Sequence, residues 1–127
     1  MAAFSDYLEG AVLDATLRAT SYTSPSTVYL ALFTSDPTDA GSGTECSGTG
    51  YARQAAAFSR TGATASNSSA IEFPTAGGSW GTISHFAIMD ASSSGNLLYH
   101  GALTASKSIT TGDIFRVPSG DLDITLA

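Results

Sequence analysis

The chain has 127 residues, of which 43% are apolar and only 13% are charged, and its formal net charge is −6. Five lysines and arginines in all cannot form the basic surface that nucleic acids or anionic membranes require, so neither is expected as a partner. Cys46 is the single cysteine, which excludes an intrachain disulfide and a cysteine-based zinc site. Few charges among many small residues indicate either a surface covered by other subunits or the polar, uncharged surface of a free β protein.

Residues 4–19 are predicted to form a helix, the only one in the chain, which Ser5 or Asp6 can cap. Most of its apolar residues fall on one stripe at helical spacing, whereas Leu13 and Leu17 lie nearly opposite that stripe. One core covers a helix on one side only, so this second apolar strip predicts contact with a partner subunit. The alternative is a helix whose C-terminal half is more deeply buried.

A strand at 27–34 follows a polar connector and carries apolar residues on both of its faces, which predicts an interior strand that needs cover on two sides. It ends in a long loop at 35–50, rich in Gly, Ser, Thr and Asp. Loops of this length are usually functional or ordered by a neighbour. Asp36 and Asp39 in this loop are therefore candidate subunit-interface residues, together with Leu13 and Leu17.

Arg53 is one of the few basic residues and lies just after the acidic loop. A guanidinium at this position can form a bidentate pair with a loop carboxylate, from Asp36, Asp39 or Glu45. Arg53 is therefore a candidate for bracing the loop, which is a structural role.

Segments of alternating or concentrated apolar residues, separated by Gly, Pro, Ser and Asn turns, predict further short strands. They cover 51–59, 70–73, 80–89, 97–104, a short stretch at Ile109, 114–117 and 121–126. The chain is thus predicted to be a single mainly β domain over 1–127. We expect an antiparallel β-sandwich or small barrel of seven or eight strands over 27–126, preceded by one N-terminal α-helix. No signal peptide or bilayer-spanning segment is apparent, so we expect a protein made and kept soluble in a cytoplasm.

Residues that could carry chemistry are few. His85 and His100 lie on adjacent predicted strands, but a zinc site needs a third or fourth ligand that the sequence does not supply. Ser84, His85 and Asp90 have the residue types of a catalytic triad, yet neighbouring strand residues point to opposite faces, so Ser84 and His85 are not expected to bond through their side chains. The acidic residues lack the spacing of a calcium loop. We therefore expect no enzyme activity, no metal and no cofactor.

Several segments are weak signals singly but form a specific signature of a protein family when taken together. They are Tyr29–Gly41, Glu45, Gly48, Gly50–Arg53, Ile71–Ala76, Trp80–Asp90, Leu98–Leu103 and Gly120–Leu122. Together they resemble a family of small virion proteins of tailed bacteriophages, whose members are often labelled tail fibre proteins. The resemblance covers nearly the whole chain, although Cys46 stands where a β-branched residue or leucine is expected. It implies a structural subunit of the virion, with no catalytic residues to carry over.

The expected function is therefore a non-enzymatic virion protein that binds other virion proteins, either major capsid or tail subunits, and forms homo-oligomers. A capsid decoration (cement) subunit is the leading interpretation, because a lone domain lacks the repetitive shaft or coiled coil of a complete fibre. A tail-fibre, collar or adaptor subunit is the alternative. A hypothesis of another class is a carbohydrate-binding β-sandwich module, in which Trp80 and Tyr51 or Tyr99 stack on sugar rings.

Overall fold

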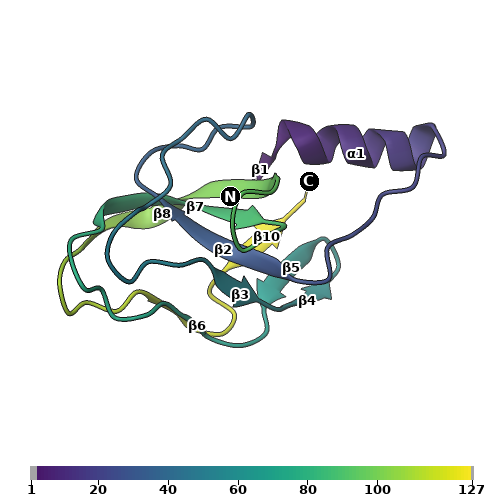
Figure 1. Cartoon of the computed structure of the whole chain (residues 1–127). Coiled ribbons are helices and arrows are strands. Elements are labelled where there is room, and N and C mark those ends of the chain that lie inside the picture. Colours follow the sequence, from purple (N-terminus) through teal and green to yellow (C-terminus); the bar gives the residue numbers. More distant parts are fainter. Residues whose placement is uncertain (1–2, 127) are drawn as a thin grey trace.

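Residues 3–126 are described by a computed structural model, in which they form ten β-strands and one α-helix (Figure 1). The strands are β1 (Ala3–Phe4), β2 (Val28–Phe33), β3 (Gln54–Ala56), β4 (Phe58–Thr61), β5 (Thr64–Asn67), β6 (Ile71–Glu72), β7 (Gly81–Met89), β8 (Leu97–Ile109), β9 (Arg116–Val117) and β10 (Asp123–Thr125), and the helix is α1 (Asp6–Leu17). The predicted class, mainly β with one N-terminal helix, is confirmed. The described residues form three antiparallel sheets and no closed barrel.

The largest sheet has five strands in the order β1-β8-β7-β2-β3, so β2 is an interior strand. It pairs with β7 in a regular register that places Leu32 opposite Phe86. Leu30 and Leu32 belong to the main core, whereas Ala31 and Phe33 belong to a smaller apolar cluster on the other face, with residues of β7 and β8. The prediction that β2 is covered on both faces is confirmed.

Two smaller sheets, β10-β5-β4 and β6-β9, contribute side chains to the main core. The chain passes between sheets at Ala57, because β3 belongs to the large sheet and β4 to the three-stranded one. The strand predicted over 51–59 is therefore two strands that meet at a corner. β5 escaped prediction because its residues are small and, except for Ala65, polar. It is a strand because it pairs with β4 on one side and β10 on the other.

β8 runs as one strand through a region where the sequence predicted two. Its register with β7 shifts midway. Ile83 pairs with Lys107 and His85 pairs with Ala102, so an advance of two residues along β7 corresponds to five residues along β8. β8 therefore bulges opposite Ser84, and such a bulge bends a strand and interrupts its pairing. The interruption explains why alternation in the sequence appeared to stop there.

The helix α1 is shorter than the predicted span of 4–19, because it begins after the N-cap Ser5 and ends at Leu17. Ala19 has a φ of 55°, a left-handed conformation that stops a right-handed helix. Of the twelve described residues of α1, Leu8 alone is buried, and Figure 1 shows the helix extending from β1 away from the strands. Among the residues that the structure describes, no helix combines the length and apolar character needed to cross a membrane.

Candidate functional site

The loop after β2 is held to the end of that strand by its own backbone. The Thr34 amide donates to the Thr44 carbonyl at 3.0 Å, and the Cys46 amide donates to the Leu32 carbonyl at 2.8 Å. Pro37 within the loop is buried. The loop is therefore an ordered part of the fold that returns beside β2.

The two loop carboxylates predicted at an interface, Asp36 and Asp39, flank a histidine of β8. His100 Nε2 lies 2.7 Å from Asp39 Oδ1, and His100 Nδ1 lies 3.8 Å from Asp36 Oδ1. The Asp39 carbonyl also accepts a 2.8 Å hydrogen bond from the amide of Asp6, at the start of α1. The loop tip thus links β8 to the helix while both carboxylates stay about half exposed. The contact with His100 was missed because it lies 61 residues away from Asp39 and leaves no local signal in the sequence.

Arg53 contacts Glu45 and none of the other acidic residues considered for it. Its Nε and Nη2 donate to the two carboxylate oxygens of Glu45, each at 2.8 Å. Its Nη1 donates to the backbone carbonyls of Ala91 and Ser94, at 2.9 and 2.8 Å, in the turn between β7 and β8. The Tyr51 hydroxyl donates to Glu45 at 2.7 Å. The guanidinium therefore joins the end of the long loop to a turn that sequence reasoning did not associate with it.

The protonation states in this cluster follow from its hydrogen bonds. Burial raises the pKa of Glu45, but the bonds from Arg53 and Tyr51 outweigh burial and hold that pKa below its ordinary value of 4.5. Burial and the bond to Glu45 raise the pKa of Tyr51 well above its ordinary value. Glu45 is therefore a carboxylate and Tyr51 a neutral donor at neutral pH.

The other predicted interface residues lie on α1 and contact little. Leu13 is 55% exposed and Leu17 is 77% exposed, on the side of the helix opposite the buried Leu8. Gly10 lies on the same side, and a Cβ added there would meet no atom within 4 Å. Gly10, Leu13 and Leu17 are called the helix strip below. The larger apolar stripe is not fully covered either, since Val12 is also exposed.

One expectation about side chains was wrong, and the sugar-binding alternative loses its main aromatic residue. Ser84 Oγ lies 2.8 Å from His85 Nδ1, at the position of β7 that faces the bulge of β8. Trp80 is 2% exposed, and its Nε1 donates to the Thr49 carbonyl at 3.0 Å. The indole is thus part of the core and is not a platform for a sugar ring.

Three exposed carboxylates, those of Asp6, Glu9 and Asp39, lie within 4.8 Å of one another at the junction of loop and helix. Exposed acidic groups of this kind are solvated, and we assign no metal ion to them.

Comparison with known proteins gives one family. The family model described as "Podophage GP4 fiber I protein gp80" matches residues 3–125. A search of curated proteins found no match.

Proposed function

Because that match spans nearly all of the chain, the protein belongs to the podophage GP4 fiber I protein gp80 family. We propose that it is a non-enzymatic subunit that binds other virion proteins through one face of α1. The family makes it a phage structural protein of the tail-fibre type. The family description also favours a fibre role over capsid decoration, the leading interpretation of the sequence.

The observation that carries the proposal is the helix strip. Full burial of a leucine side chain contributes about 1.5–3 kcal/mol. Covering the exposed fractions of Leu13 and Leu17, 55% and 77%, would therefore contribute roughly 2–4 kcal/mol per subunit. Association itself costs at least about 4 kcal/mol, so the burial of one strip does not exceed this cost. It suffices as one part of a larger contact in a particle, where several contacts act at once.

The loop tip offers the second part of that contact. Asp36 and Asp39 are half exposed, and the Asp39 carbonyl bonds to the first residue of α1. We infer a partner surface with an apolar groove for the helix strip and basic side chains for these carboxylates. In this proposal Arg53 braces the loop by holding Glu45 to the β7–β8 turn.

Particle incorporation tests the proposal. The double substitution Leu13→Asp and Leu17→Asp places two charges on the helix strip, and its copy number in purified particles is measured by quantitative mass spectrometry. We expect at least a tenfold loss of incorporation, because each charge would have to be desolvated in an apolar groove. Circular dichroism melts of the purified variant should retain the β domain, since neither leucine belongs to the core.

The control is Ala15→Asp, which adds one such charge to an exposed residue of the same helix. Position 15 lies about 160° around the helix from both leucines, so this variant should incorporate normally. Wild-type copy number for the double variant would contradict the proposal. Location in an electron-microscopy map of the particle decides between fibre and shell: density spread over the capsid would support decoration instead.

A further inference from the structure

One side of the described sandwich has no backbone pairing between β8 of the large sheet and the C-terminal strands β9 and β10, and this gap is called the seam below. Within residues 3–126, β8 beyond His100 pairs only with β7, while β10 pairs only with β5 and β9 only with β6. The bulge of β8 lies along this opening. A cavity of about 220 Å³ occupies the opening between β8 and the segment from β9 to β10.

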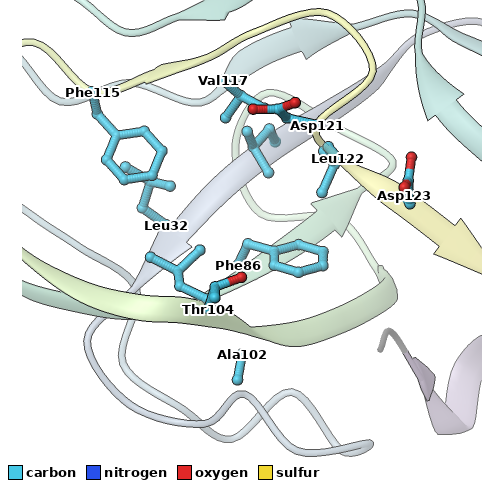
Figure 2. A pocket seen from close by; sticks show the side chains of 11 residues that line it. Leu32, Phe86, Ala102, Thr104, Phe115, Val117, Asp121, Leu122 and Asp123 are labelled. Atoms are coloured by element: carbon cyan, nitrogen blue, oxygen red, sulfur yellow. The ribbon is translucent and has the colours of Figure 1, made fainter.

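The floor of this seam cavity is apolar. Leu32 of β2, Phe86 of β7, Phe115 and Leu122 line it, and all four side chains belong to the main core. Figure 2 shows Phe86, Phe115 and Leu122 directed toward a common space between the ribbons of β8 and the C-terminal segment. The cavity exceeds the about 150 Å³ at which an apolar cavity in another protein holds a benzene-sized group.

The rim, in contrast, is acidic. Asp121 and Asp123 line the cavity from the C-terminal segment, and both are exposed (Figure 2). In the described part of the chain, neither carboxylate lies within 4.0 Å of a lysine, arginine or histidine nitrogen. Asp123 accepts one hydrogen bond, from the Ser66 hydroxyl. The rim therefore carries negative charge without an internal cation to neutralise it.

We propose that the seam cavity receives a lysine or arginine side chain of a neighbouring protein subunit. Such a side chain has an aliphatic stem that favours the apolar floor and a cationic head that favours the two carboxylates. A hydrated inorganic cation gains nothing from the floor. A purely apolar side chain leaves the rim charges unmatched, and anionic ligands are repelled by the net charge of −6. That the donor is a virion subunit rests on the proposed function, whereas the preference for a basic side chain rests on the cavity alone.

The first experiment titrates methyl-labelled protein with capped Gly-Lys-Gly and Gly-Arg-Gly peptides, observed by NMR. We expect millimolar binding, with shifts of the Leu32 and Leu122 methyl signals. A capped Gly-norleucine-Gly peptide has the stem without the charge and should bind more weakly, as should a Gly-Glu-Gly peptide. Equal binding of the norleucine and lysine peptides would overturn the proposal, as would the absence of shifts at the cavity methyl groups.

The second experiment removes the rim charges. Asp121→Asn should weaken peptide binding by about threefold to fivefold, the size of a solvent-accessible ion pair. Combining it with Asp123→Asn should weaken binding further, and asparagine still offers Ser66 an acceptor. Glu72→Gln, on β6 and outside the cavity lining, removes the same charge and should leave binding unchanged. Unchanged binding by the double variant would overturn the proposal. These measurements use the free protein, so their failure is separate from a failure of helix-strip variants to alter particle incorporation.

Discussion

Replacing Arg53 with methionine is expected to lower the free energy of unfolding by about 3 kcal/mol. The Arg53 side chain is 8% exposed and makes four hydrogen bonds, two to Glu45 and two to backbone carbonyls of the β7–β8 turn. Methionine keeps much of the side-chain length, so the loss is mainly polar. Removing one partner of a fully buried ion pair costs about 3–5 kcal/mol. Glu45 is 26% exposed and keeps its bond from Tyr51, which places the expected cost at the low end of that range.

Thermal and chemical denaturation measure this loss. For a chain of this length, 3 kcal/mol corresponds to a fall in Tm of about 10 °C. Arg18→Met is the matched control, because Arg18 is 74% exposed and pairs at 3.2 Å with Asp14 one helical turn away. Such exposed helical pairs contribute about 0.3–0.5 kcal/mol. A fall in Tm for Arg53→Met no larger than that of the control would refute the reasoning.

The same ion pair predicts a pH dependence. The pKa of Glu45 is below 4.5 in the folded protein, so the unfolded chain binds this proton more readily. The stabilisation by Glu45 is therefore fully present above pH 4.5 and is lost as the pH falls through the lower, folded-state pKa. We expect wild type to lose more stability than Arg53→Met between neutral pH and this acidic range. Parallel stability curves for the two proteins would show that Arg53 does not set this pKa.

Three further predictions concern single residues. Gly48→Ala should lower stability by roughly 1–3 kcal/mol, because its Cβ would lie 2.5 Å from Cδ1 of Trp80; a wild-type denaturation midpoint would show that this contact relaxes freely. The thiol of Cys46 should resist a disulfide reagent at pH 8 until the protein unfolds, since burial and the nearby Glu45 raise its pKa to about 11; rapid labelling of the native protein would contradict this. Gly10→Ala should raise stability by about 0.5–1 kcal/mol, because the added methyl group meets no neighbour; a lower Tm would indicate a contact at the helix strip.

Elements whose physical signal is local were predictable from the sequence. The two-faced pattern of β2 predicted an interior strand, and β2 serves an apolar cluster on each side of the sheet. β5 was not predictable in this way, because its four small and mostly polar residues are a strand only through their pairing with β4 and β10. The end of α1 also depends on backbone conformation, since Ala19 carries a positive φ without being glycine.

In the candidate site, too, the contacts with a local sequence signal were predictable and those that depend on the fold were not. Charge and position in the sequence identified Arg53 and gave Glu45 as one of its possible partners, because a guanidinium beside an acidic loop can pair with a loop carboxylate. Its bonds to Ala91 and Ser94 depend on where the β7–β8 turn lies, and backbone carbonyls carry no signature in a sequence. Ideal strand alternation predicted no side-chain contact between Ser84 and His85, whereas Ser84 Oγ and His85 Nδ1 lie 2.8 Å apart where the register of β7 and β8 is irregular.

The position of the helix strip is determined by contacts that lie at one end of α1. The Ser5 amide donates to the Leu98 carbonyl at 2.9 Å, the Ser5 hydroxyl donates to the Leu97 carbonyl, and the Asp6 amide donates to the Asp39 carbonyl at 2.8 Å. Leu8 adds the only buried side chain of the described helix. Since a helix is stiff over this length, fixing its first turn sets the direction of every later residue. The direction in which Leu13 and Leu17 point is therefore set by the cap and the loop, so a substitution at the buried Ser5 is expected to alter the contact proposed for the helix strip without touching the partner.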